Sequence, residues 1–365
     1  MSSSDTPVFD IQPNAAPVPG SEREARIADP GFGKVFTDHM AVIRYSEDRG
    51  WHDARIQARA PVELDPAAAV LHYAQEIFEG MKAYRLTDGA TALFRPDANA
   101  ARFKRSAQRM AMPELPEELF LESIAKLVEI DKDWIPTMEG GSLYLRPFMF
   151  ASETFLGVRP AREYLYMVIA SSVGAYFKGG TPAITIWVSD DYSRAAPGGT
   201  GAAKCGGNYA ASLVAQAEAI RQGCDQVVFL DAAEHRWVEE LGGMNLFFVM
   251  DDGSMVTPPL KGTILPGITR DSILKLAQDE GIAVREEAYA IDQWRSDAES
   301  GRLRETFACG TAAVVTAVGT VKSTNGDFTI GGGGPGQMTQ RMRQRLVAIQ
   351  RGEAEDPHGW VKRLF

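Results

Sequence analysis

The sequence predicts a protein of the α/β (α+β) class, built from two domains that each mix strands and helices. Its 365 residues exceed what one hydrophobic core usually serves. Strand-like apolar runs alternate with helical patterns in both halves. Between them, VGAYFKGGTP has three glycines, a proline and no hydrophobic periodicity, which is typical of a linker. We therefore expect a flexible N-terminal arm, a smaller domain, an interdomain loop and a larger domain, over residues 1–30, 31–175, 176–186 and 187–365.

The first half predicts strands and helices in a self-contained α+β unit. Residues 39–64 alternate around a turn at 47–50, which indicates a β-hairpin. Residues 66–80 begin with Pro and end with Gly around an apolar stripe, so we expect a helix there. The remaining expected elements are a hairpin, two helices and two strands, over residues 81–96, 97–111, 116–133, 141–150 and 165–173.

The second half begins again with a strand and ends with a helix. The expected order is a strand, a helix of small residues, a strand, a hairpin, a helix after a Pro-Gly turn, a strand and a basic helix. These elements occupy residues 183–190, 208–223, 226–231, 245–258, 264–281, 313–321 and 337–352.

Composition and charge exclude several classes of function. The chain has 38 Lys and Arg against 48 Asp and Glu, a net charge of −10, which opposes binding to nucleic acid or to anionic membranes. Its longest apolar runs are about half of the roughly 20 residues that cross a bilayer. Three cysteines without a CxxC pair, and five scattered histidines, favour neither a disulfide framework nor a metal site. We expect a reducing, cytoplasmic location.

One lysine, Lys204, stands in a run of small residues, GGTGAAKCGGNYA. Glycines let the backbone approach a ligand closely while the lysine stem projects into a cavity. A desolvated lysine loses pKa, becomes nucleophilic near neutral pH and forms a Schiff base with a carbonyl. The alternative is a Gly-rich surface loop with an incidental lysine, and this stretch alone does not decide between the two.

A Schiff-base cofactor such as pyridoxal 5′-phosphate also needs an acid at its ring nitrogen. Glu240, in WVEELGGMNLFFV, precedes a strongly apolar strand that would draw a carboxylate inward. The alternative is a solvated pair at a strand start, and we expect one of Glu239 and Glu240 to be solvated.

The same cofactor needs an anion site for its phosphate. In ILPGITRDS a turn precedes a helix, with Thr269 as the expected N-cap, so the backbone N–H groups of Ile268 and Thr269 could hold a dianion. Thr311 could add a hydroxyl and Arg102 a cation. An ordinary capped helix, and an exposed helix arginine, are the alternatives.

Taken together, these segments resemble the branched-chain aminotransferases, within the fold-type-IV group of pyridoxal-phosphate enzymes. The similarity begins near residue 30 and continues along nearly the whole chain. It is carried, in family order, by FGKVFTDHM, LHYAQEIFEGMKAY, FRPDANAARFKRSAQRM, SLYLRPFMFASE, VGAYFKGG, GGTGAAKCGGNYA, EELGGMN, LKGTILPGITRDS and CGTAA.

The resemblance implies a role for each candidate residue. Lys204 would bond to the aldehyde of the cofactor and move the proton at the substrate Cα, Glu240 would pair with the ring nitrogen, and Tyr209 would bind the phenolic oxygen. The other implied cofactor contacts, including those to the phosphate, are Arg102, Arg194, Leu265, Ile268, Thr269 and Thr311.

The resemblance further implies an apolar and aromatic substrate pocket. The implied substrate contacts are Phe32, Tyr73, Tyr144, Arg146, Tyr176, Gly243 and Ala312. Arg146 would bind the distal carboxylate of glutamate or 2-oxoglutarate and would be satisfied by tyrosine hydroxyls when no carboxylate is present. Gly243 departs from several relatives, which have a threonine there, so one hydroxyl contact is in doubt.

The activity implied is ping-pong transfer of the amino group of leucine, isoleucine or valine to 2-oxoglutarate, by a homodimer acting on small molecules. Two rivals remain. One is a D-amino-acid aminotransferase or aminodeoxychorismate lyase of the same fold. The other is a protein that keeps the fold to bind a phosphorylated ligand without catalysis.

Overall fold

The computed structural model describes residues 7–174 and 183–365, and the chain divides into two compact units. Unit 1 comprises the described residues up to 174 together with 203–206 and 349–365, and unit 2 comprises 183–202 and 207–348. Two short segments of the expected second domain, including the one that holds Lys204, therefore belong to unit 1. Most of the expected interdomain loop lies outside the described residues.

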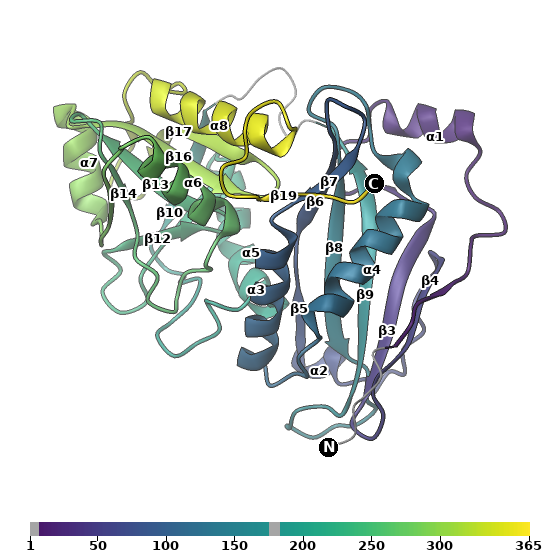
Figure 1. Cartoon of the computed structure of the whole chain (residues 1–365). Helices are drawn as coiled ribbons and strands as arrows, with labels where there is room; N and C mark the ends of the chain where they lie inside the picture. The colour runs from purple at the N-terminus through teal and green to yellow at the C-terminus, as the bar shows by residue number, and fades with distance from the viewer. Residues whose placement is uncertain (1–6, 175–182) are drawn as a thin grey trace. The chain divides into compact units, whose positions relative to one another are not determined.

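Unit 1 is built on one mixed sheet, in purple to teal in Figure 1 except for the yellow strand β19. Its strands follow the order β1-β4-β3-β9-β8-β6-β7-β19, while β2 pairs with β9 and β5 with β8. The strands are β1 (Asp10–Ile11), β2 (Val35–Phe36), β3 (His39–Ser46), β4 (Gly50–Ala58), β5 (Glu76–Phe78), β6 (Met81–Arg85), β7 (Thr91–Phe94), β8 (Ser142–Ala151), β9 (Glu163–Val173) and β19 (Val361–Arg363).

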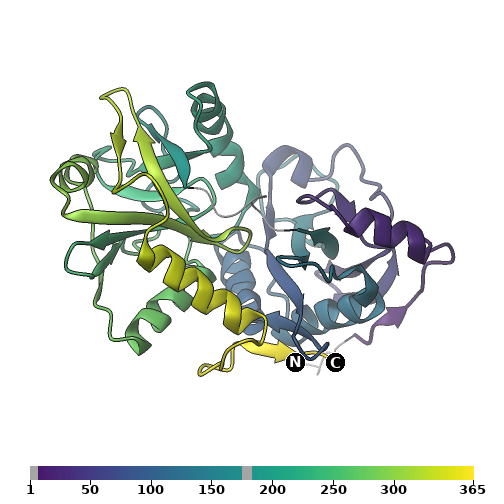
Figure 2. The ribbon, with the colours of Figure 1, turned by 90° about the horizontal axis from the view of Figure 1, so that it is seen from above.

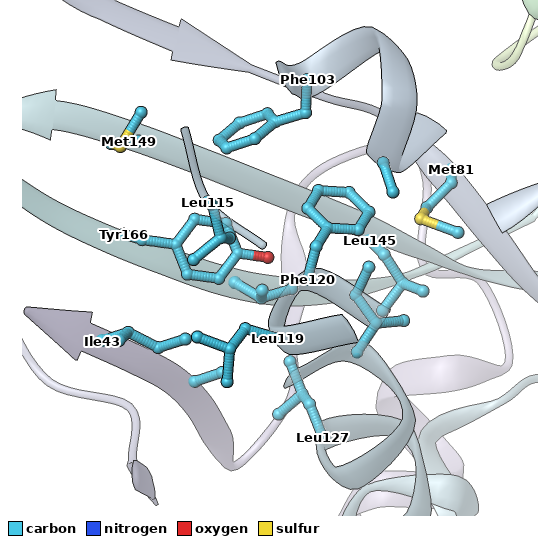
Figure 3. Packing of buried hydrophobic residues seen from close by; sticks show 14 of the residues in the cluster. Ile43, Met81, Phe103, Leu115, Leu119, Phe120, Leu127, Leu145, Met149 and Tyr166 are labelled. Atoms are coloured by element: carbon cyan, nitrogen blue, oxygen red, sulfur yellow. The ribbon is translucent and has the colours of Figure 1, made fainter. Parts of the chain in front are cut away.

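Helices cover the sheet of unit 1 and close its core. They are α1 (Gly20–Ile27), α2 (Val70–Tyr73), α3 (Pro96–Arg109), α4 (Glu117–Ile130) and a 3-10 turn at Lys132–Trp134. The apolar stripe of α4 packs on β3 and β9, where Phe120 meets Phe103 of α3 at 5.3 Å and Tyr166 of β9 at 6.1 Å between ring centroids (Figure 3). Burial of this stripe stabilises both helices against the sheet.

Unit 2 has a second mixed sheet with the order β12-β11-β10-β17-β16-β13-β14-β15, to which β18 is added beside β17. Its strands are β10 (Ile184–Ser189), β11 (Gln226–Leu230), β12 (Val238–Leu241), β13 (Asn245–Met250), β14 (Met255–Thr257), β15 (Val284–Glu286), β16 (Leu303–Gly310), β17 (Val314–Lys322) and β18 (Phe328–Thr329). Its helices are α5 (Gly206–Arg221), α6 (Ile268–Asp279), α7 (Ile291–Ser300) and α8 (Gln337–Gln350); the first residue of α5 and the last two of α8 belong to unit 1.

One sequence-based expectation about the elements is wrong. The predicted helix over 66–80 is only α2 followed by strand β5, because Ala74 adopts a left-handed conformation (φ 49°) and Glu76–Phe78 pair with β8 instead. The expected N-terminal arm contains β1 and α1, seen at the periphery of unit 1 in Figure 2. Its backbone is held where the N–H of Val18 donates to Asp38 at 3.0 Å.

The other predicted elements are present in both halves. The hairpins β3–β4 and β6–β7, the helices α3 and α4, and the strands β8 and β9 lie where the sequence indicates. Within the described residues, no helix is both long enough and apolar enough to cross a bilayer.

Candidate active site

The main chain of Lys204 is fixed on both sides by unit 1. Its N–H donates to the Ser106 hydroxyl on α3 at 3.0 Å, and its carbonyl accepts from the Phe78 N–H at the end of β5 at 2.9 Å. The half-buried side chain extends so that Nζ lies 4.8 Å from the centroid of the Phe78 ring. The lysine is therefore held by its backbone while its ammonium rests on an aromatic face, which a cation favours.

The residue after Phe78 is a fully buried carboxylate that sequence reasoning missed. Glu79 accepts from Arg102 Nε at 2.7 Å and from a terminal nitrogen of Arg102 at 2.8 Å, and Asn99 Nδ2 donates to it at 2.8 Å. Burial alone would raise its pKa, but the charge and hydrogen bonds of Arg102, with the charge of Lys204, outweigh burial and lower the pKa. Glu79 is thus an ionised partner for both cations.

This pairing gives a local role to Arg102, which the sequence proposes as a phosphate ligand. Its side chain is almost fully buried and bidentate on Glu79. Two of the five guanidinium N–H donors make these bonds. The alternative of an exposed helix arginine is wrong, because Arg102 lies on the buried side of α3.

Gly206, two residues after Lys204, lies in close contact with the Glu76 carboxylate. The backbone N–H of Gly206 bonds to the carboxylate of Glu76, and a Cβ at Gly206 would overlap that carboxylate. Burial raises the pKa of Glu76, against the Gly206 hydrogen bond and the charge of Arg146. A side chain at position 206 would therefore displace the Glu76 carboxylate and disturb its hydrogen bond to the Gly206 N–H.

Three residues of the expected substrate pocket share a corner of unit 1 with Phe78. Arg146 donates to the Tyr144 hydroxyl at 3.1 Å, and its guanidinium carbon lies 4.8 Å from the Phe78 ring centroid. The Phe32 ring meets Tyr144 edge-on at 5.1 Å. Arg146 thus has a tyrosine hydroxyl as an acceptor.

A further expected pocket residue, Tyr73, lies among other aromatic side chains. The ring of Tyr73, at the end of α2, packs near His72 and Phe155, with centroid separations of 6.1 and 6.4 Å. Tyr176 lies outside the described residues.

In unit 2 the centre of the candidate site is a buried ion pair. Glu240 on β12 lies 2.5 Å from a terminal nitrogen of Arg194 and accepts the Leu265 N–H at 2.9 Å. Arg194 also donates to the carbonyls of Gly201 and Thr263, both at 2.9 Å. Arg194 therefore links Glu240 to the segments that hold Gly201 and Thr263. The Glu240 carboxylate is held in a fixed orientation.

The expectation that one of the two adjacent glutamates is solvated is wrong. Glu239 and Glu240 are 7% and 3% exposed, because β12 is buried on both faces. The Glu239 carboxylate accepts from the Thr263 hydroxyl, yet burial outweighs both this bond and the charge of Arg194 and raises the pKa of Glu239. Alternation along a strand gives the two neighbours different surroundings.

The helix expected to bind an anion begins two residues earlier than the sequence suggests. The N-cap of α6 is Gly267, and Thr269 lies inside the first turn, buried, so its assignment as the N-cap is wrong. A Cβ at Gly267 would overlap the side-chain oxygen of Asn245, whose amide donates to Glu240 at 3.3 Å and to the Leu265 carbonyl at 3.1 Å. Close packing requires Gly267, which leaves the helix start without a capping side chain.

Asn245, which sequence reasoning also missed, joins the remaining candidates in unit 2. It pairs with Cys309 across β13 and β16, so the turn that holds Gly243 lies beside the turn that holds Thr311 and Ala312. Tyr209 is half-buried in the first turns of α5.

The sequence profile of the family described as Amino-transferase class IV matches residues 76–321, more than half of the chain. The chain belongs to the class IV aminotransferases. This class IV chain is similar to the branched-chain-amino-acid aminotransferase of Mycolicibacterium smegmatis, with 56% identity over 98% of both chains. It is 57% identical to the probable branched-chain-amino-acid aminotransferase of Streptomyces coelicolor, over 98% of this chain and 99% of that one.

Solved structures place the class IV chain in the same fold. The Escherichia coli branched-chain amino acid aminotransferase is 30% identical, with a TM-score of 0.72 over 90% of this chain and 99% of that one. The Thermobaculum terrenum enzyme of the same name, solved in its PLP form, is 23% identical, with a TM-score of 0.72 over 90% and 98% of the two chains. The expectation of a fold-type-IV α/β enzyme is therefore confirmed.

Proposed function

We propose that this enzyme is a pyridoxal-phosphate-dependent branched-chain-amino-acid aminotransferase. It transfers the amino group of leucine, isoleucine or valine to 2-oxoglutarate in two half-reactions, releasing the branched 2-oxo acid and L-glutamate. The full-length similarity to branched-chain aminotransferases at 56% and 57% identity supports this assignment.

The residues present fit pyridoxal phosphate. Glu240 is a buried carboxylate oriented by Arg194 and the Leu265 N–H, as a partner of a protonated ring nitrogen must be. The start of α6, at the small residue Gly267, offers backbone N–H groups to an anion. When bound, the cofactor supplies an aldehyde for amines and a ring that takes up the electron pair left when the substrate Cα loses its proton.

The residues that would hold the cofactor can be assigned by the group they offer. Lys204 supplies the amine, Glu240 the carboxylate for the ring nitrogen and Tyr209 a hydroxyl for the phenolic oxygen, while Arg194 positions Glu240. The phosphate would be held by the N–H groups, hydroxyls and cation of Leu265, Ile268, Thr269, Thr311 and Arg102.

The fixed position of Lys204 is the observation that carries the proposal. Its N–H and carbonyl are both hydrogen-bonded within unit 1, so the main-chain position from which its side chain extends is fixed. Its amine can then accept a proton from the substrate Cα in one step and give the proton back in a later step of the amino transfer. The ionised Glu79 stabilises the protonated lysine between these transfers.

The contact between Arg146 and Tyr144 supports a pocket that accepts two kinds of substrate. With an apolar side chain bound, Arg146 keeps its hydrogen bond to Tyr144 and its place on the Phe78 ring. With glutamate or 2-oxoglutarate bound, the distal carboxylate replaces the Tyr144 hydroxyl as its acceptor, since a charge-assisted bond is the stronger. Phe32, Tyr73, Tyr176, Gly243 and Ala312 would complete the apolar surroundings of the substrate.

We further propose a homodimer in the cytoplasm. Leu156 and Val158, in the loop between β8 and β9, are 70% and 92% exposed and offer apolar side chains to a second subunit. The three cysteines are all buried and free, as in proteins of reducing compartments.

The test is an assay of glutamate formed from L-leucine and 2-oxoglutarate, with the absorption of lysine-bound pyridoxal phosphate followed in parallel. Lys204→Ala is expected to abolish both, while Lys126→Ala, a partly exposed lysine of α4, retains both. Activity on D-alanine or aminodeoxychorismate in place of L-leucine would instead assign the chain to a rival of the same fold. Cofactor binding without any turnover would contradict an enzymatic role.

A further inference from the structure

Unit 2 contains a cavity that shares no lining residue with the proposed active site. It has a volume of about 330 Å³ and lies between β12, the turn after β11 and the loop between β14 and α6. Its surface is mainly apolar, with walls from Pro197, Trp237, Val238 and Ile264. This volume lies at the small end of the roughly 300–1,000 Å³ of small-molecule sites, so its occupant is a compact molecule.

Glu239 is the buried charged residue that lines this cavity. It follows Val238 on β12 and is 7% exposed, while its neighbour Glu240 binds Arg194. One carboxylate oxygen accepts from the Thr263 hydroxyl, whereas Oε2 is buried and has no hydrogen-bond partner among the described residues. A buried acceptor left unpaired is unfavourable, so an occupant that donates to Glu239 recovers part of the lost hydrogen bonding.

The other charged groups around the cavity leave Glu239 as the group to be paired. Asp231 also lines the cavity, but its two oxygens accept four backbone N–H groups of its own turn. Lys261 lines the cavity and Arg236 lies beside the Trp237 ring. Both side chains are exposed, so water screens their charges. Arg194 acts on Glu239 only at a distance, because it is bonded to Glu240.

We propose that this cavity is a binding site for a small apolar amine, whose protonated nitrogen pairs with Glu239 while its hydrocarbon part fills the apolar walls. The terminal torsion of a glutamate is soft, so the carboxylate can turn its unpaired oxygen to the amine without moving the strand. A protonated amine suits the site better than a neutral donor, since charge-assisted hydrogen bonds are about twice as strong. The site is independent of the proposed function, because Glu239 is not among the residues that would hold cofactor or substrate.

Binding at this site is coupled to the ionisation of Glu239. Burial raises the pKa of Glu239, so the empty site takes up a proton as the pH falls through this raised pKa, and a cationic ligand displaces that proton. Affinity should therefore fall, and proton release should rise, as the pH is lowered toward the raised pKa.

The probe is N,N-dimethylbenzylamine, a tertiary amine that forms no stable imine with an aldehyde, titrated into the holoenzyme by calorimetry. N,N-dimethylbenzamide, which is neutral and of similar size, is the matched ligand. We expect the amine to bind at least tenfold more tightly than the amide, and to release protons in buffers of different ionisation enthalpy. Equal binding of the two ligands, or displacement of the amine by L-leucine or 2-oxoglutarate, would overturn the proposal.

Variants of the protein test the same site independently. Glu239→Gln is expected to lower the affinity for the amine at least tenfold. Ala288→Trp should fill part of the cavity and prevent the amine from binding. Glu299→Gln, which alters an exposed carboxylate of α7, should leave the affinity unchanged. Thermal melting of each variant verifies that it folds. Unchanged affinity in a folded Glu239→Gln variant would refute the assignment, and the paired ligands decide the question on the unaltered protein.

Discussion

The ion pair between Glu79 and Arg102 provides a sharp test of the packing beneath Lys204. Glu79→Gln keeps the shape of the side chain but removes its charge, and leaves the Arg102 guanidinium buried at 4% exposure. Gln has one acceptor oxygen where the carboxylate has two, whereas Glu79 receives two bonds from Arg102, one from Asn99 and one from the Gly80 N–H. At least one donor of Arg102 or Asn99 therefore faces an amide nitrogen in the variant.

The expected cost is about 3–5 kcal/mol of the free energy of unfolding, the usual penalty for removing one partner of a buried pair. A surface pair gives the comparison, since the side chains of Glu122 and Lys126 are 40% and 34% exposed on α4. Glu122→Gln should cost only about 0.3–0.5 kcal/mol. The double variant Glu79→Leu/Arg102→Met should be far closer to the parent than Glu79→Gln, because an apolar pair leaves no charge unpaired.

The assay is urea unfolding followed by circular dichroism, analysed for the transition of unit 1. Because the pKa of Glu79 is lowered in the folded state, its stabilisation is complete above its unfolded value and lost as pH falls through the folded pKa. The difference between parent and Glu79→Gln should be constant near neutral pH and shrink only in acid. A cost below about 1 kcal/mol at pH 7 would refute the reasoning that burial makes this pair indispensable.

Three further predictions concern the lysine segment, the core and pH. Gly206→Ala should lower transamination of leucine at least tenfold, since its Cβ overlaps a carboxylate of β5, while Gly207→Ala, whose Cβ meets no described atom within 4 Å, should stay near the parent rate. Phe103→Ala, in the cluster of Figure 3, should cost about 3–5 kcal/mol in urea unfolding, whereas Phe32→Ala, 40% exposed, should cost far less. The pKa of Glu239 is raised in the folded state, so its protonated form favours folding and this contribution is lost as pH rises through the folded pKa. As the pH is raised from acid through the folded pKa, the melting temperature of Glu239→Gln should therefore fall less than that of the parent, and a larger fall would contradict the assigned sign.

The elements that the sequence predicts well are those whose signal is local. Hairpin β3–β4 follows from alternation around a turn, and α4 from an apolar stripe after Pro116 with Glu117 and Glu118 in its first turn. The segment 66–80 has a helical stripe as well, yet most of it is not helical. Its end pairs with β8, and this non-local pairing overrides the local preference for a helix.

In the candidate site, too, some residues can be recognised from the local sequence and others only from their contacts in the fold. Lys204 is conspicuous because its neighbours are too small to pack around it, and Glu240 because an apolar strand follows it. Glu79 carries no comparable signal, since a glutamate near a glycine is common and its burial depends on Arg102 of a later helix. Asn245 is equally ordinary in sequence, and its amide reaches Glu240 across the short turn between β12 and β13.

By itself the sequence determined the class of protein, the order of most elements and the chemical groups of the candidate site, because these depend on residue type and local spacing. Only the tertiary structure decided which charges are partners. It placed Glu79 on Arg102 and Glu240 on Arg194, and it buried Glu239 beside a cavity. Burial and pairing arise from contacts between segments distant in the chain, and the strength of an electrostatic interaction depends on these surroundings.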